Sequence, residues 1–242
     1  MTASSSADPS LVQDLVDANR ILYNEGVLDA FGHVSARHDK RSDRFLLAGN
    51  VAPALVEPGD ILEFDFDGSP VVDSGRRLYA ERFLHAEIYR ARPDVMAVVH
   101  SHSVAVLPFS VSQQARLRPV CHMSGFLGGG VPVFEIRDTA GLATDLLIRN
   151  RELGAALAKT LDRHAVVLMR GHGSTVVAPS IKLAVYRAVY TEVNARVQLQ
   201  AERLGPITFL TEEEADATAE SNEAHVDRPW LLWKAKARSG GI

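Results

Sequence analysis

The chain has 242 residues, a length that one large α/β domain fills. Hydrophobic residues make up 46% of it and charged residues 23%, so it can bury its own core, and its single cysteine, Cys121, excludes an intramolecular disulfide and favours a reducing compartment. The net charge of −4 without a basic patch argues against nucleic acid, and no apolar run approaches the ~20 residues of a membrane helix. We therefore expect a single cytoplasmic domain over residues 1–242, with neither nucleic acid nor membrane as a partner.

The chain is expected to begin with a short tail and a helix. Residues 1–9 are small and polar, and we interpret them as a flexible N-terminal tail. Asp8 and Pro9 are typical of a helix start, because an acidic side chain accepts from free backbone N–H groups and proline fits the first helical position. Apolar residues then recur at helical spacing as far as Gly26, which is a typical helix stop.

The next elements alternate between strands and a helix. Short strands are predicted at 34–38 and 44–47, followed by a strand with alternating apolar and polar residues at 61–67. A helix is predicted at 81–92, where a following proline ends it. The fully apolar stretch at 95–99 indicates a strand in the middle of a sheet.

The second half of the chain continues this alternation. A short helix at 104–107 is expected to end at Pro108. The remaining predicted elements are a strand at 131–136, a helix or helix pair at 139–162, a strand at 166–169 and a long helix at 181–204. Strands and helices in this order favour a layered α/β fold.

Three histidines follow predicted strands. His100 and His102 come directly after the apolar stretch, and residues two apart in extended backbone point to the same side, so both imidazoles can bind one divalent cation. His172 follows another apolar strand and lies between two glycines, where the backbone can approach closely. Three histidines leave a coordination position open, as catalytic metal sites require. The pattern alone leaves the alternative that these side chains cap helices or bond backbone carbonyls.

Three motifs in this order resemble the class II aldolase/adducin family over residues 30–200. They are Gly32-His33-Val34-Ser35-Ala36-Arg37, the run from Glu81-Arg82-Phe83-Leu84-His85 to Val98-Val99-His100-Ser101-His102, and Gly171-His172-Gly173. The resemblance implies a three-layer α/β/α fold around a mostly antiparallel central sheet. It implies one divalent metal ion per subunit, held by His100, His102 and His172. It also implies that Glu81 is the catalytic acid or base and fills the open metal position without substrate, and that the chain forms a homo-oligomer, commonly a tetramer.

Three positions depart from the sugar-phosphate aldolases of the family. Where those enzymes hold phosphate with hydroxylated or glycine-rich stretches, this chain has His33, Asn50 and Tyr79. An imidazole and a phenol suit a flat, acidic aromatic ligand better, so we expect these three residues to contact substrate. The motifs around them are more similar to a decarboxylase branch, whose members act in aromatic catabolism on hydroxylated diacids such as 3,4-dihydroxyphthalate and 3-hydroxy-2-methylpyridine-4,5-dicarboxylate.

The implied function is the metal-dependent removal of a carboxylate ortho to a ring hydroxyl. Protonation of the ring carbon turns such an acid into a β-keto acid, and a cation stabilises the charge that develops on oxygen as CO2 leaves. Glu81 would deliver or relay the proton, and apolar Phe83 and Leu84 are expected to raise its pKa by desolvation. Zinc suits three imidazoles, while manganese, cobalt and iron stay open.

Two other functions stay as alternatives. One is an aldolase or epimerase that acts on a sugar phosphate. The absence of hydroxyl groups at Ala48, Asn50 and Ala80 argues against this function. The other is an adducin-like interaction domain without catalysis. The presence of all three histidines, His100, His102 and His172, together with Glu81 argues against it. His85 is interpreted either as a residue that orients Glu81 or a metal ligand without binding the metal itself, or as a buried core histidine. Arg170 is expected to make a structural ion pair.

Overall fold

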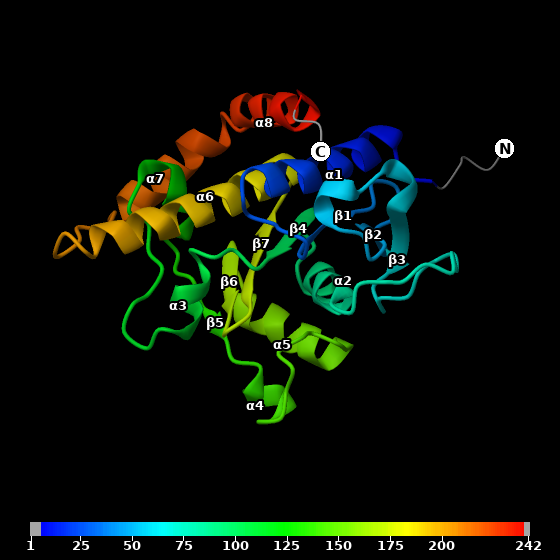
Figure 1. The fold of residues 1–242 in the computed structure, drawn as a ribbon, viewed down its shortest axis with the longest axis horizontal. Helices are drawn as coiled ribbons and strands as arrows, with labels where there is room; N and C mark the ends of the chain where they lie inside the picture. Colours follow the sequence, from blue (N-terminus) through cyan, green and yellow to red (C-terminus); the bar gives the residue numbers. More distant parts are fainter. Residues whose placement is uncertain (1–5, 240–242) are drawn as a thin grey trace.

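The computed structural model describes residues 6–239, which fold around one seven-stranded sheet (Figure 1). The strands are β1 (His33–Arg37), β2 (Arg44–Ala48), β3 (Ile61–Asp65), β4 (Ala97–Ser101), β5 (Val133–Phe134), β6 (Val166–Met169) and β7 (Gly173–Ala178). The α-helices are α1 (Pro9–Asn24), α2 (Arg82–Ala91), α3 (Leu107–Val111), α4 (Arg137–Ala140), α5 (Arg151–Leu161), α6 (Ile181–Ala201), α7 (Glu212–Glu223) and α8 (Asp227–Ser239). The 3-10 helices are η1 (Pro53–Leu55), η2 (Pro58–Asp60) and η3 (His122–Leu127).

The sheet is mostly antiparallel, as predicted. Its strand order is β3-β2-β1-β4-β7-β6-β5, and all neighbouring pairs are antiparallel except β5 and β6, which are parallel. Strand β4 occupies the middle of the sheet, which explains why the stretch that forms it is apolar on both faces. The predicted central strand is therefore confirmed, although it is shifted along the chain so that it includes His100 and Ser101.

Alternate residues of the central strands pack into two separate cores, one on each face of the sheet. Val99 of β4 and Leu168 of β6 belong to the core that α1, α6 and α8 cover. Val98 and Val167 belong to the opposite core, which α2 and α5 cover. Figure 1 shows these two groups of helices on opposite sides of the sheet. The predicted three-layer α/β/α arrangement is confirmed, and each fully buried aliphatic side chain in it contributes about 1.5–3 kcal/mol to stability.

The residues that flank helix α1 explain where it begins and ends. The Asp8 carboxylate accepts the backbone N–H of Ser10 at 2.8 Å, and Pro9 occupies the first turn. The helix ends at Asn24, and Gly26 adopts a φ of +72° just beyond it. The predicted flexible tail of residues 1–9 therefore extends too far, because Asp8 and Pro9 belong to the helix start; residues 1–5 lie outside the described residues.

The predicted elements of the middle of the chain need corrections. Proline lacks an N–H and fits the first helical turn, so Pro108 lies in the first turn of α3 and does not end a helix at 104–107. Strand β5 is shorter than the predicted 131–136. Of the predicted helix or helix pair at 139–162, the pair is found: α4 begins two residues earlier, and residues 141–150 separate it from α5. Strand β7 was not predicted, because its first residues, Gly173, Ser174 and Thr175, lack the apolar character of a buried strand.

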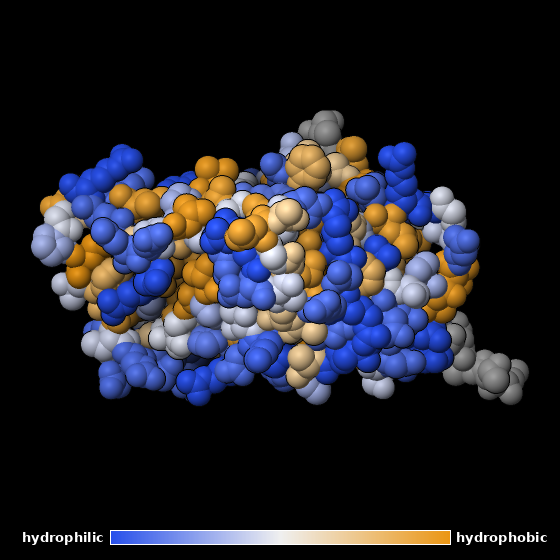
Figure 2. All heavy atoms as spheres, turned by 90° about the horizontal axis from the view of Figure 1, so that it is seen from below, coloured by the Kyte–Doolittle hydropathy of each residue, from blue (hydrophilic) through white to orange (hydrophobic). Residues whose placement is uncertain are grey.

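The surface of the described part mixes polar and apolar side chains. The face shown in Figure 2 carries hydrophobic residues in small groups between hydrophilic ones. Among the described helices, none is long and apolar enough to span a bilayer. Trp230 and Trp233 are 2% and 6% exposed and pack into the core beneath α8, so the apolar face of this last helix is covered within the chain.

Candidate metal centre

Four side chains from distant parts of the sequence meet at one end of the sheet. Glu81 immediately precedes α2, and His100 lies in β4. His102 is the first residue after β4, and His172 lies in the tight turn between β6 and β7. One ligand atom from each of the four lies within 4.8 Å of every other. The structure thus brings together the three predicted metal ligands and the predicted acid or base, which are separated by up to 91 residues in the sequence (172 − 81 = 91).

The imidazoles turn the same nitrogen atom toward a common point. The Nε2 atom of His102 lies 3.1 Å from Nε2 of His100 and 3.0 Å from Nε2 of His172. Nδ1 of His100 donates to the Ser174 carbonyl at 3.1 Å, and Nδ1 of His172 donates to the Leu146 carbonyl at 2.8 Å. Because a carbonyl oxygen only accepts, each of these Nδ1 atoms carries a proton, and the neutral ring keeps its lone pair on Nε2.

This arrangement fits a divalent cation. Lone pairs of neighbouring Nε2 atoms repel one another at about 3 Å unless a positive charge lies between them. Neutral imidazoles whose outer N–H is bonded to a backbone carbonyl are the usual ligands of transition metals, and the bonded carbonyl fixes the tautomer. Three nitrogen donors and one carboxylate oxygen form a donor set that suits Zn2+, Mn2+, Co2+ or Fe2+.

The two oxygen atoms of the Glu81 carboxylate have different partners. Oε1 accepts the backbone N–H of Ile148 at 3.0 Å, while Oε2 lies 3.4 Å from Nε2 of both His100 and His172. Burial opposes ionisation of this group, but the nearby imidazoles of His100 and His172 favour the carboxylate, and the net effect holds the pKa of Glu81 well below its usual range. The expected rise of this pKa by desolvation is therefore wrong: charge and hydrogen bonding outweigh burial.

The local sequence explains why His172 reaches the other ligands. A Cβ atom at Gly173 would lie 2.0 Å from the Ser101 carbonyl oxygen, so only glycine allows the turn to approach the end of β4 this closely. The pairing of Ser101 with Ser174 continues the β4–β7 ladder up to this contact. The turn and the end of β4 are thereby held together at the place where both present histidines.

Of the three predicted substrate residues, His33 contacts the cluster and Tyr79 contacts His33, whereas within the described residues no contact links Asn50 to the cluster. The His33 ring is buried, and its centroid lies 5.1 Å from that of His100 and 4.6 Å from that of Tyr79. The Tyr79 hydroxyl donates to the Val51 carbonyl, and burial raises the pKa of Tyr79 to about 12. Asn50 is exposed, directly before Val51, and its backbone N–H donates to the Arg77 carbonyl.

His85 connects this neighbourhood to the core. Its Nε2 shares a hydrogen bond of 2.7 Å with Nδ1 of His33, and its Nδ1 bonds the Ser35 hydroxyl at 2.6 Å. The Ser35 hydroxyl also bonds the Tyr89 hydroxyl at 2.8 Å. Burial lowers the pKa of His85 to about 3, and burial together with the charges of His85 and His100 lowers that of His33 well below 6.5, so both rings are neutral. The interpretation of His85 as a buried core histidine is confirmed, whereas its two ring nitrogens bond His33 and Ser35 and not Glu81 or a predicted metal ligand.

Three contributors to the site were missed by the sequence analysis. The Leu146 carbonyl and the Ile148 N–H are backbone groups, which leave no signal in the sequence. The third is Phe31, whose ring is 67% exposed and has its centroid 6.3 Å from that of His102. An exposed aromatic residue directly before the Gly32-His33 motif was a detectable signal. Arg170 pairs with Glu135, as expected for a structural arginine.

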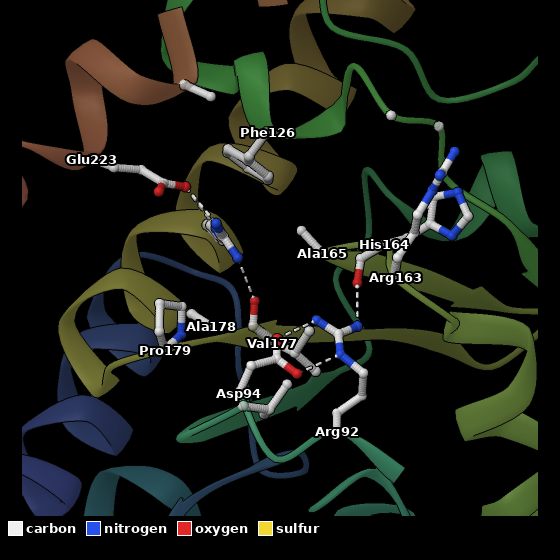
Figure 3. Close-up of a pocket in the computed structure, with 15 residues that line it drawn as sticks. Arg92, Asp94, Phe126, Arg163, His164, Ala165, Val177, Ala178, Pro179 and Glu223 are labelled. Carbon is white, nitrogen blue, oxygen red and sulfur yellow. Dashed lines mark hydrogen bonds and ion pairs between the residues drawn. The ribbon is translucent and has the colours of Figure 1, made fainter. Parts of the chain in front are cut away.

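A pocket of about 620 Å3 lies at the opposite end of the sheet from the four clustered side chains (Figure 3). Its walls include Val177 and Ala178, at the end of β7 farthest from the histidines. Arg92 pairs with Asp94 at 2.7 Å, and Arg187 pairs with Glu223, so these two arginines are neutralised within the pocket. The pocket contains none of the four clustered side chains and forms no part of the candidate metal centre.

Comparison with known proteins identifies the family. The family profile described as Class II Aldolase and Adducin N-terminal domain matches residues 13–199. The chain belongs to the class II aldolase and adducin family. It is 41% identical to the decarboxylase tropJ of Talaromyces stipitatus over 96% of this chain and 95% of that protein. It is 33% identical to a 3,4-dihydroxyphthalate decarboxylase of Arthrobacter keyseri over 78% of this chain and 77% of that protein.

Solved structures of the family share the fold. An L-fuculose 1-phosphate aldolase from Glaciozyma antarctica superposes with a TM-score of 0.77 at 24% sequence identity, over 95% of this chain and 90% of that one. The predicted membership of the family and of its decarboxylase branch is confirmed, and so is the predicted class of enzyme, a carboxy-lyase.

Proposed function

We propose that this class II aldolase-family decarboxylase uses one divalent metal ion per subunit to remove a carboxylate ortho to a ring hydroxyl from a hydroxylated aromatic or heteroaromatic dicarboxylate. The metal ligands in this proposal are His100, His102 and His172, and Glu81 is the residue that moves the proton. The observation that carries the proposal is the convergence of three Nε2 atoms and one carboxylate on a single point, with the imidazole tautomers fixed from outside.

The surroundings of the cluster support an aromatic substrate. Phe31 exposes an aromatic ring beside His102, and the neutral His33 ring packs against Tyr79 on another side of the cluster. Aromatic rings favour offset or edge contacts with a flat ligand, worth about 0.5–1.5 kcal/mol for each pair. Both decarboxylase relatives named above are similar to the chain over most of its length. The substrate in the name of one of them, 3,4-dihydroxyphthalate, is an aromatic diacid with hydroxyl groups.

Glu81 is placed to act first as a base and then as an acid. Because its pKa is depressed, Glu81 enters the reaction as a carboxylate and accepts the proton of the substrate hydroxyl. It then returns this proton to the ring carbon that bears the departing carboxylate, which makes the substrate a β-keto acid. The Ile148 N–H holds Oε1 throughout, so Oε2 is the atom that exchanges the proton.

The C–C bond then breaks and its electron pair restores the aromatic ring. CO2 leaves, the ring oxygen carries the negative charge as a phenolate, and a proton from solvent neutralises the product. A bound divalent cation supplies Lewis-acid stabilisation of the charge that develops on that oxygen. In this proposal His33, whose ring contacts both His100 and Tyr79, orients the substrate ring together with Tyr79.

We further propose that the chain forms a homo-oligomer, with a tetramer as the expected state, as its family membership suggests. Light scattering of the purified protein tests this directly, because a monomer, a dimer and a tetramer differ in mass by factors of two.

The test of the function is a panel of substrates. The metal-loaded protein is incubated with 3,4-dihydroxyphthalate, with a hydroxypyridine dicarboxylate and with matched diacids that lack the ortho hydroxyl, and CO2 is measured. We expect CO2 release only where the hydroxyl is present and only with a divalent ion. Release of aldehyde from a sugar 1-phosphate in place of CO2 would support the aldolase alternative and refute the proposal.

A further inference from the structure

One short stretch of chain holds two members of the candidate metal centre at once. The Leu146 carbonyl accepts Nδ1–H of His172 at 2.8 Å, and two residues later the Ile148 N–H donates to Oε1 of Glu81 at 3.0 Å. The stretch 146–148 lies in the segment that links α4 to α5 beneath the sheet (Figure 1). The orientations of a metal ligand and of the proton-transferring carboxylate therefore depend on the same backbone.

The backbone of this stretch is strained at its first residue. Leu146 has a φ of +67° and is one of two residues other than glycine with a positive φ in the described part of the chain. The left-handed region is unfavourable for any residue with a Cβ atom, and it is a genuine outlier for β-branched residues. Such strain persists only where the surroundings fix it, and it tends to occur at functional sites.

The surroundings of Leu146 do fix it. The Thr144 hydroxyl accepts the Leu146 N–H at 3.1 Å, and the Asp145 carboxylate accepts the Leu147 N–H at 3.2 Å. The Leu146 side chain packs against the core that α2 and α5 cover. Side chain, N–H and carbonyl are thus each held by a different partner, and the carbonyl has the His172 ring as its partner.

We propose that Leu146 is a positioning residue, whose left-handed backbone aims its carbonyl at His172 and places the following Ile148 N–H on Glu81. The inference rests on the proposed metal site and deepens it. The Leu146 carbonyl keeps the proton of His172 on Nδ1, which leaves the Nε2 lone pair for the cation. The same turn keeps Oε2 of Glu81 directed toward His172. Relaxation of this one residue would misorient both groups together.

Two substitutions separate positioning from simple packing. Leu146→Gly removes the side chain from the core but keeps the carbonyl, and glycine adopts the positive φ without strain. Leu146→Val keeps most of the apolar side chain, but a β-branched residue resists this backbone conformation. If Leu146 only filled space, the glycine variant would be the more damaged of the two. If Leu146 positions His172, we expect the valine variant to bind metal more weakly than the glycine variant.

Metal affinity is measured by competition with a chelator, using Mn2+ and Zn2+ as probes. Loss of a group that orients a metal ligand through a hydrogen bond weakens metal binding by about 10–100-fold, so we expect the valine variant to bind at least about fivefold more weakly than the glycine variant. The glycine variant is expected to stay within about threefold of wild type, even though it unfolds at a lower temperature. Equal affinity of the two variants, or tighter binding by the valine variant, would overturn the inference.

A second readout does not depend on metal. Nitrogen NMR of the metal-free protein, above the pKa of His172, reports which ring nitrogen carries the proton. We expect the proton of His172 on Nδ1 in wild type and in Leu146→Gly, and a mixture of both tautomers in Leu146→Val. If wild type binds no divalent ion, the proposed function fails, while the NMR comparison still decides the role of Leu146. An unchanged Nδ1 proton in the valine variant would refute that role.

Discussion

Oε2 of Glu81 lies 3.4 Å from Nε2 of His172, and the pKa values of the two groups shift in opposite directions. Burial alone lowers the pKa of His172, but the hydrogen bond and charge of Glu81 and the Leu146 carbonyl raise it above 6.5. The pKa of Glu81 falls below its usual range because His100 and His172 outweigh its burial. Below the pKa of His172 the two groups of the metal-free protein therefore form an ion pair, and binding of the proposed divalent cation to Nε2 would require loss of the His172 proton.

Metal affinity is expected to rise with pH and then level off. Below the raised pKa of His172 the imidazolium must lose its proton before Nε2 can bind a cation, so affinity falls by about tenfold per pH unit there. Burial and the charges of His100 and His172 lower the pKa of His102 to about 4. This ring is therefore already neutral at higher pH and adds no pH dependence to metal binding there. Chelator competition between about pH 5 and about pH 9 measures the profile, which covers the range in which histidines titrate. A flat profile contradicts the exchange of a proton for a metal ion.

Glu81→Gln is expected to lower kcat by about 10²–10⁴-fold, because the amide cannot accept or return the proton. Metal content should stay close to one ion per chain, since the three imidazoles are unchanged. Both quantities are measured on the same preparation. Glu212→Gln, at the exposed start of α7, is the control for loss of a negative charge. Wild-type turnover by Glu81→Gln would show that another group moves the proton.

His33→Asn tests the contact with substrate. Asparagine can still bond His85 but removes the ring that packs against Tyr79 and His100, so we expect KM to rise by about tenfold with a smaller change in kcat. His164→Asn, in the pocket at the other end of the sheet, is the matched control. Steady-state kinetics separate the two constants. An unchanged KM excludes His33 as a substrate contact.

Phe31→Ala tests the aromatic character of the ligand. Loss of one aromatic contact worth about 0.5–1.5 kcal/mol should raise KM by about 2–12-fold, while thermal stability stays unchanged because the ring is 67% exposed. Leu204→Ala removes a 91% exposed apolar side chain elsewhere and serves as the control. Identical KM values for Phe31→Ala and wild type would remove Phe31 from the site.

Gly173→Ala is expected to destabilise the protein by about 3 kcal/mol or more, because the new Cβ atom would lie 2.0 Å from the Ser101 carbonyl oxygen. Metal binding should be lost with it, since the turn that carries His172 must move away from β4. The midpoint of thermal unfolding measures the first effect. Gly59→Ala has no atom within 4 Å of its new Cβ and should unfold like wild type. Equal midpoints for the two variants contradict the close approach.

The fold was predictable where local patterns agree with the tertiary structure. The stretch at 166–169 is apolar throughout and forms β6 with those bounds, and the Asp8-Pro9 pair marks the start of α1. Strand β7 could not be predicted from the sequence. It is buried because it lies between β4 and β6, and the residues at its start are not apolar. Pro108 was misinterpreted because proline both ends and begins helices, and only the surrounding structure decides between the two.

The candidate site was predictable in its side chains and unpredictable in its backbone. His100, His102, His172 and Glu81 come together because the motifs that carry them place them at one end of the sheet. The carbonyl of Leu146 that fixes one tautomer has no sequence signature, since every residue has a carbonyl. The pKa of Glu81 was misjudged for the same reason: apolar neighbours are visible in a sequence, whereas the imidazoles and the N–H that face the carboxylate are not.

The central claim is that three imidazoles hold the divalent ion on which decarboxylation depends. Metal content and CO2 release are measured together for wild type and for the variant in which His100, His102 and His172 are all alanine, with unfolding curves of both. We expect one ion per chain and metal-dependent CO2 release for wild type, and neither for the folded variant. A folded variant that retains the ion or releases CO2 at the wild-type rate would contradict it.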